Sequence, residues 1–131
     1  MKKTMEKKIG PSPYMRLLGV KLEEAAYPRV RVALEFDDQL TNPNGTLHGG
    51  VISSLVDIAL GSALFQDQKV RGIATVELKV NYLQGITKGM VTAEAEIIFR
   101  KNLMAYGEVR IYNEGVLVAV GSATYRLTEG Q

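Results

Sequence analysis

The residues with the clearest chemical potential lie in one segment, Asn42 to Asp57, which holds a histidine, two adjacent glycines and an aspartate. Gly49 and Gly50 follow a polar loop and stand where a long apolar helix is predicted to begin. Backbone N–H groups in the first turn of a helix have no intrahelical partner, so they bind anions and stabilise developing oxyanions. Asp57 lies about two turns further along, among apolar residues, where a carboxylate is costly and commonly has a partner or a function.

Each of these residues also has a structural interpretation. Asp57 could pair with a basic side chain or point to water, and Gly49 and Gly50 could allow tight packing of the helix on a strand. His48 is favoured as an orienting residue that hydrogen-bonds the loop backbone, with general acid–base catalysis as the alternative. Asn42 could be a turn residue, because Asn-Pro commonly opens turns, or it could orient an attacking water.

The composition limits the classes of function. The chain has 131 residues, of which 46% are hydrophobic and 23% charged, as expected for one soluble domain with a full core. The net charge of +2 is too small to favour nucleic acid or an anionic membrane as the main partner. With no cysteine and one histidine, the chain has no thiolate nucleophile, no thiolate metal site and no histidine-rich metal site, so we expect no metal. We expect no resident cofactor either.

The N-terminus begins like a signal peptide but lacks the apolar core of one, because lysines and two prolines interrupt it. No stretch approaches the ~18 apolar residues of a membrane-spanning helix. We therefore predict a flexible, basic N-terminal tail over residues 1–13, a single domain over residues 14–131, and a cytoplasmic protein.

The elements that must position these groups follow from the hydrophobic pattern. A helix is predicted over residues 49–66, and because apolar residues cover most of its circumference, it should be buried on most sides. One face of it is small and polar, as expected where another chain or a ligand comes close. The members of this stripe are Gly50, Ser53, Ser54, Asp57 and Gly61.

Alternating apolar residues predict strands on both sides of that helix. The expected ranges are a short helix over 14–19 and strands over 20–26, 30–36, 74–82, 91–99, 106–112 and 116–126. Short links after the long helix predict an antiparallel meander. The predicted fold is therefore α+β, with a long central helix wrapped by a curved antiparallel β-sheet of roughly five to six strands.

The pattern Asn-x5-His-Gly-Gly-x6-Asp from Asn42 to Asp57, followed by a run of strands, resembles the hotdog-fold acyl-CoA thioesterases. Within the 4-hydroxybenzoyl-CoA thioesterase superfamily it is most similar to the PaaI-type, or phenylacetate-pathway, branch. The resemblance covers the chain from residue 14 onward. It implies a hotdog fold, a homodimer with sheets joined edge to edge, dimers paired into homotetramers, and hydrolysis of an acyl-CoA, with coenzyme A as part of the substrate.

The resemblance also implies roles for the motif residues. The helix-start amide of Gly49 or Gly50 in one subunit would face Asp57 of the other subunit. That amide would polarise the thioester carbonyl, helped by the helix dipole, while Asp57 acts as general base or as nucleophile. Asn42 would hold the attacking water or the thioester.

Further positions follow with less support from the motif. Pro43 stiffens the Asn-Pro-Asn loop, so Asn44 competes for the role of the first amide side chain. Thr75 matches a serine or threonine that family members often carry on the strand after the helix. Arg100 and Lys101 match, by location, the region where basic side chains reach the phosphates of coenzyme A. From the residues alone this pair is either solvated surface or a phosphate site.

Two other functions stay open at this level. A hotdog enoyl-thioester hydratase or dehydratase pairs a histidine with a helix acid, but at a different spacing and with different flanking residues. A non-catalytic acyl-CoA-binding hotdog module usually carries a DNA-binding segment, and no helix-turn-helix pattern precedes Val20. Thiol release separates the thioesterase from both alternatives, and hydration of an enoyl-CoA identifies the hydratase.

Overall fold

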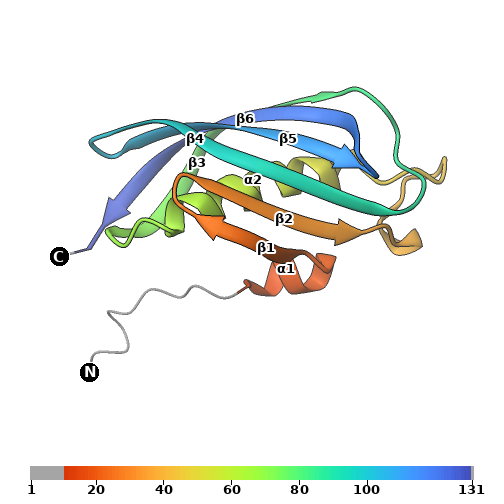
Figure 1. The fold of residues 1–131 in the computed structure, drawn as a ribbon, viewed down its shortest axis with the longest axis horizontal. Coiled ribbons are helices and arrows are strands. Elements are labelled where there is room, and N and C mark those ends of the chain that lie inside the picture. The colour runs from red at the N-terminus through yellow and green to blue at the C-terminus, as the bar shows by residue number, and fades with distance from the viewer. Residues whose placement is uncertain (1–10, 131) are drawn as a thin grey trace.

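The structure is a computed structural model that describes residues 11–130 (Figure 1). Within these residues the helices are α1 (Pro13–Leu18) and α2 (Gly49–Phe65), with a 3-10 turn at Asp38–Leu40. The strands are β1 (Lys21–Ala26), β2 (Arg29–Glu35), β3 (Val70–Tyr82), β4 (Met90–Lys101), β5 (Met104–Asn113) and β6 (Val116–Glu129). They form a six-stranded antiparallel sheet in the order β1-β2-β4-β5-β6-β3, which confirms the predicted α+β architecture of a curved sheet around a central helix. In this part of the chain, neither helix is long and apolar enough to cross a membrane.

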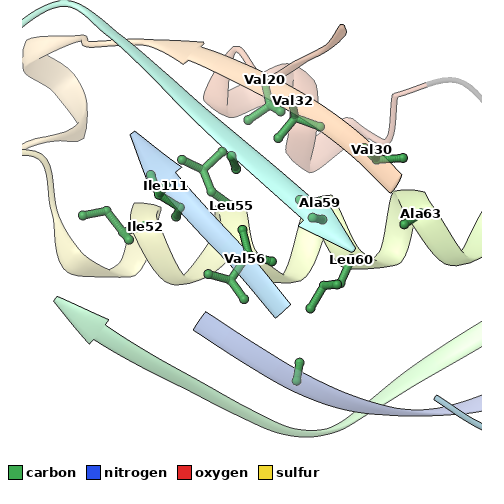
Figure 2. Close-up of a cluster of buried hydrophobic side chains, with 14 of the residues drawn as sticks. Val20, Val30, Val32, Ile52, Leu55, Val56, Ala59, Leu60, Ala63 and Ile111 are labelled. Atoms are coloured by element: carbon green, nitrogen blue, oxygen red, sulfur yellow. The ribbon is translucent and has the colours of Figure 1, made fainter. Parts of the chain in front are cut away.

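Helix α2 forms the centre of the core. Its buried residues are Val51, Ile52, Leu55, Val56, Ala59, Leu60, Gly61, Ala63 and Leu64. Figure 2 shows Leu55, Ala59 and Leu60 in one cluster with Val32 and Ile111, which come from two strands of the sheet. Because each fully buried Val or Leu contributes about 1.5–3 kcal/mol, packing against the sheet fixes the position of α2. A side chain carried by α2 is therefore held on a rigid element.

Helix α1 begins one residue earlier than the sequence predicts. The hydroxyl of Ser12 accepts from the backbone N–H of Met15 at 3.2 Å, and Pro13 occupies the first turn, where its missing N–H has no cost. Gly19 ends the helix in the left-handed conformation, with φ of 83°. Of the predicted N-terminal tail, residues 1–10 lie outside the described residues.

The connection from β3 to β4 departs from the predicted meander. β4, β5 and β6 do form one, but β3 pairs with β6 and β4 pairs with β2, so the link 83–89 crosses from one side of the sheet to the other. Ile86 in this link is fully buried, and its carbonyl accepts from the backbone N–H of Leu47 at 2.8 Å. Ile86 thus joins the link to the loop that precedes α2, and the strand order leaves β3 as an edge strand.

Two β-bulges reverse the alternation that the sequence predicts. In β3 the register shifts between Thr75 and Glu77, so Thr75 faces α2 as Leu78 does. Strict alternation would place these two residues on opposite faces, because they are three positions apart. In β4 the shift between Ile97 and Phe99 leaves Phe99 52% exposed, although strict alternation would place it on the same inward face as Ile97. An extra residue in one strand exchanges the two faces beyond it. The bulge in β3 thus turns the Thr75 hydroxyl toward the helix.

Candidate active site

Asp57 lies in the middle of α2, half-buried, and its carboxylate is held by two hydroxyl groups. The Tyr125 hydroxyl donates to Oδ1 at 2.7 Å, and the Thr75 hydroxyl donates to the same oxygen at 2.9 Å. No basic side chain in the range 11–130 forms an ion pair with Asp57. The carboxylate therefore has hydrogen-bond donors but no counter-charge, which argues against the interpretation of Asp57 as half of a structural ion pair.

Sequence reasoning missed Tyr125. It lies on β6, is 0% exposed, and its hydroxyl also reaches the backbone carbonyl oxygen of Asp57 at 3.3 Å. Burial, reinforced by the hydrogen bond to Asp57, raises the pKa of Tyr125 above its ordinary value, so the phenol stays protonated and donates. The sequence did offer one indication of its role. Tyr125 alternates with Ala123 and Leu127 on the buried face of the last strand, where a tyrosine hydroxyl needs a hydrogen-bond partner.

A groove of about 860 Å³ lies beside Asp57, between α2 and the N-terminal part of the chain. The residues that α2 and its C-cap Gln66 contribute are Asp57, Ile58, Gly61, Ser62, Phe65 and Gln66. Apolar residues on the other walls include Met15 of α1, Val20 and Leu22 before and within β1, and Ile73 of β3. Among the described residues that line this mainly apolar groove, Asp57 is the single acidic one.

Tyr14 attaches α1 to α2. Its hydroxyl lies 2.7 Å from Oγ of Ser54, and Ser54 donates its single hydroxyl hydrogen to the carbonyl of Gly50 at 2.8 Å, so Tyr14 is the donor. Ser53 donates to the same carbonyl at 3.0 Å. The small polar stripe predicted on α2 is therefore partly covered by α1 of the same chain, which forms one wall of the groove.

His48 is the N-cap of α2. Its Nδ1 accepts from the backbone N–H of Gly50 at 3.0 Å, which places the proton of the neutral ring on Nε2. The amide of Gly50 is thereby occupied. No described residue accepts from the N–H of Gly49, whose carbonyl accepts from the Tyr82 hydroxyl at 3.1 Å. Of the two predicted glycine amides, that of Gly49 is the one available to a ligand.

The chain itself gives little reason for glycine at these two positions. Neither Gly49 nor Gly50 has a positive φ. A Cβ at Gly49 would meet the Tyr82 ring at 3.4 Å, an ordinary contact, and a Cβ at Gly50 would lie 3.3 Å from Nδ1 of His48, a tighter contact that a small shift of the imidazole ring would relieve. Side-chain rings, and not the backbone of a strand, face these glycines, so close helix–strand packing does not explain them. Their lack of side chains keeps the start of α2 accessible.

Asp57 and the amide of Gly49 are too far apart in one chain to act on the same bond. Eight residues of α-helix separate them, which is about 12 Å along the axis. A reacting carbonyl must lie about 3 Å from both its oxyanion donor and the attacking group. One chain therefore contains both the predicted oxyanion donor, the Gly49 N–H, and the predicted catalytic carboxylate of Asp57, but at two separate points.

Asn42 organises the loop before α2. Its side-chain amide donates to Oγ1 of Thr46 at 2.7 Å, and its Oδ1 accepts from the backbone N–H groups of Asn44 at 2.9 Å and of Thr46 at 3.2 Å. Gly45, with φ of 84°, completes the turn in a conformation that favours glycine. These bonds agree with the interpretation of Asn42 as a turn residue. A contact of Asn42 or Asn44 with water or substrate stays a prediction.

Arg100 and Lys101 end β4 in different environments. The Arg100 side chain is 16% exposed and forms ion pairs with Asp67, in the α2–β3 connection, and with Glu129 at the end of β6. The backbone N–H of Lys69 and the Arg100 guanidinium hold the pKa of Asp67 below its ordinary value, against burial, which raises it. Arg100 thus joins three segments, and its contact with the phosphates of coenzyme A stays a prediction. Lys101 is exposed, and its contact with coenzyme A stays a prediction.

A curved antiparallel sheet around one long central helix defines a hotdog protein. The sequence model of the Thioesterase superfamily matches residues 44–120, more than half of the chain. The chain belongs to the thioesterase superfamily, a family of thioester hydrolases. The predicted family is therefore confirmed.

Individual relatives agree with this assignment. The medium/long-chain acyl-CoA thioesterase YigI of Salmonella typhimurium is 30% identical, over 86% of this chain and 84% of that protein. A protein of Saccharolobus solfataricus is 31% identical over 73% of this chain, which spans only 64% of that relative. The conserved protein PA5202 from Pseudomonas aeruginosa is 26% identical with a TM-score of 0.85, over 90% and 95% of the two chains. A mutant of the phenylacetic acid degradation protein PaaI from Thermus thermophilus is 26% identical with a TM-score of 0.82, over 88% and 98%.

Proposed function

We propose that this protein hydrolyses acyl-CoA thioesters to the free acid and coenzyme A, with Asp57 as the catalytic carboxylate. The observation that carries the proposal is the state of that carboxylate. It is held by the hydroxyls of Tyr125 and Thr75, has no basic partner within residues 11–130, and lies beside a mainly apolar groove. A carboxylate that is not neutralised by a cation can take a proton from water or attack a carbonyl carbon.

Two chemical routes use these residues. As a general base, Asp57 takes a proton from water, the water oxygen attacks the thioester carbon, the C–S bond breaks, and coenzyme A leaves as the thiolate. As a nucleophile, one oxygen of Asp57 attacks the same carbon and displaces that thiolate, and water then hydrolyses the resulting anhydride. In both routes the carbonyl oxygen gains negative charge, which the Gly49 N–H and the dipole of α2 stabilise.

The separation of about 12 Å between these groups supports a site built from two chains. We propose that Gly49 of one subunit and Asp57 of a second subunit act on the same thioester. β3 is a 13-residue strand at the edge of the sheet, and its Val76 is 60% exposed, which supports the predicted edge-to-edge homodimer. Pairing of such dimers into a homotetramer stays a prediction.

The groove supports an apolar acyl group as the other part of the substrate. From Asp57 to Gln66 it follows α2 for about 13 Å, the length of an extended chain of roughly ten carbons. Each methylene removed from water contributes about 0.8 kcal/mol, or roughly fourfold in affinity. The name of the relative YigI, a medium/long-chain acyl-CoA thioesterase, supports the same substrate class. We therefore propose medium-chain acyl-CoA as the preferred substrate.

Release of free thiol from acyl-CoA substrates of increasing chain length, acetyl to palmitoyl, tests the activity. Asp57→Asn keeps the shape of the side chain but removes its charge, so we expect a loss of at least about 100-fold in turnover at an unchanged melting temperature. Glu94→Gln, an exposed carboxylate on the sheet, is the matched control and should behave as wild type. Wild-type turnover in Asp57→Asn would refute the assignment. Tight binding without release would indicate an acyl-CoA-binding module, and hydration of an enoyl-CoA would indicate a hydratase.

A mixing experiment tests whether two chains share each site. Gly49→Pro removes the amide hydrogen and adds a ring at the start of α2, at a position in the first turn of a helix where proline is well tolerated. A dimer of one Asp57→Asn chain and one Gly49→Pro chain regains one intact site. Random exchange should therefore restore about a quarter of the wild-type sites from two inactive variants. No recovery after demonstrated subunit exchange would count against the shared site.

A further inference from the structure

We infer that Tyr125 is a positioning residue for the reaction: together with Thr75 it occupies Oδ1 of Asp57 and so leaves Oδ2 as the reacting oxygen. This inference rests on the proposed role of Asp57. Both hydroxyls donate to Oδ1, at 2.7 and 2.9 Å. No residue between 11 and 130 hydrogen-bonds to Oδ2. Every buried side-chain oxygen or nitrogen of these residues has a hydrogen-bond partner, so Oδ2, which has none, is open to solvent. The two carboxylate oxygens are therefore not equivalent.

The sheet explains why the two hydroxyls meet at one atom. Thr75 and Tyr125 are directly opposite in the pairing of β3 with β6, so their side chains stand on the same face of the sheet, toward α2. The bulge after Thr75 places this residue on that face. The backbone register of two strands, and not a flexible loop, therefore holds the pair of donors beneath Asp57.

The two donors differ in rigidity. Tyr125 is 0% exposed and packed within the core, so its ring has no room to turn. Thr75 is exposed on the edge strand β3. Tyr125 is thus the fixed support that prevents rotation of the carboxylate, and Thr75 is the member of the pair nearer to solvent.

The effect of Tyr125 should appear in the pH dependence of the reaction. The titratable or charged groups that line the groove with Asp57 are Tyr14 and Arg16 of α1 and Lys21 of β1. Tyr125 faces Asp57 from β6, while Thr75 of β3 does not titrate. The residues of β4 and β5 buried against α2 are apolar. Asp57 is therefore the carboxylate in this described environment, and a change in its hydrogen bonds should appear in the acidic limb of kcat/KM.

The experiment compares Tyr125→Phe with wild type across pH, using one acyl-CoA substrate. Loss of a hydrogen bond to a charged group is expected to move the acidic limb up by about one pH unit. We also expect kcat to fall about tenfold while KM stays within about twofold, because a disordered carboxylate impairs the chemical step and not substrate binding. Tyr106→Phe is the matched control, since the Tyr106 hydroxyl donates to an exposed carboxylate, that of Glu108, at 3.5 Å. Its pH profile should equal that of wild type.

Two further variants separate positioning from loss of structure. Thr75→Val should shift the acidic limb in the same direction, and Thr75→Ser should restore it, because serine keeps the hydroxyl. If Tyr125→Phe does not fold, fluorotyrosine at position 125 keeps the ring and strengthens the donor, so it should move the limb to lower pH. A wild-type profile in folded Tyr125→Phe, or no shift with fluorotyrosine, would overturn the inference. Full turnover in Asp57→Asn would instead refute the proposed function itself.

Discussion

The variant Arg100→Met tests whether the guanidinium of Arg100 stabilises the fold or binds the substrate. The guanidinium forms ion pairs with Asp67 and Glu129, which lie 33 and 29 residues away along the chain. Methionine keeps a long apolar stem, so the substitution removes the charge and its hydrogen bonds with little loss of packing. We therefore expect Arg100→Met to lose stability and to keep its affinity for the substrate.

The size of the loss follows from the exposure of the three side chains. Arg100, Asp67 and Glu129 are 16%, 24% and 34% exposed, so the pair with Asp67 is the better shielded of the two. A hydrogen bond between shielded charges contributes about 2 kcal/mol, and an exposed pair contributes under about 1 kcal/mol. The variant should therefore be less stable by about 2–3 kcal/mol. In a domain of this size that corresponds to a fall of roughly 10 °C in melting temperature.

The loss should depend on pH in a defined direction. Because the pKa of Asp67 is lowered in the folded state, its pairing stabilises the fold above the ordinary aspartate pKa of about 4. That contribution disappears as the pH falls through the lower, folded value. The difference in unfolding free energy between wild type and Arg100→Met should thus be full at pH 7 and should shrink below about pH 4.

Urea unfolding followed by circular dichroism, from neutral pH to about pH 3, measures this difference. The control is Lys101→Met, which changes the exposed neighbouring cation and should leave stability unchanged. KM values for an acyl-CoA and for the matching acyl-pantetheine, which lacks the phosphates, test the other interpretation. Unchanged stability of Arg100→Met, with a raised KM for the acyl-CoA alone, would refute the structural role and support phosphate binding.

Two more predictions concern the groove and the helix cap. Gly61→Val should lower kcat/KM for decanoyl-CoA more than for acetyl-CoA, because a Cβ at Gly61 already lies 2.9 Å from Cδ1 of Ile73. Gly61→Ala adds a smaller side chain and favours the helix by about 1 kcal/mol, so it serves as the milder variant. An unchanged preference for acyl-chain length in both variants would contradict the proposed acyl site. His48→Ala should cost about 1 kcal/mol in urea unfolding, and His48→Asn should recover much of it. An inactive but fully stable His48→Asn would indicate acid–base catalysis by His48.

Local patterns were sufficient for the elements and for the position of the carboxylate. The long apolar run after Gly49 and Gly50 predicted a helix over residues 49–66, and the structure has α2 at Gly49–Phe65. Asp57 could be identified from the same run, because a charge is conspicuous among apolar neighbours. The family resemblance added Thr75, which periodicity alone would have placed away from the helix. These features depend on residues within a few turns or on a short motif, which a single sequence displays directly.

The tertiary structure decided which distant residues meet. Tyr125 reaches Asp57 across 68 positions, and Arg100 reaches Asp67 across 33, in a sheet whose strand order is not the order of the chain. A bulge of one residue decides that Thr75 faces the helix. Such contacts depend on strand order and register, which the burial of residues such as Ile86 determines over the whole chain, and which leave no periodic signal in the sequence. The sequence alone therefore determined the helix, the strands and the candidate carboxylate, whereas only the folded sheet determined what holds that carboxylate.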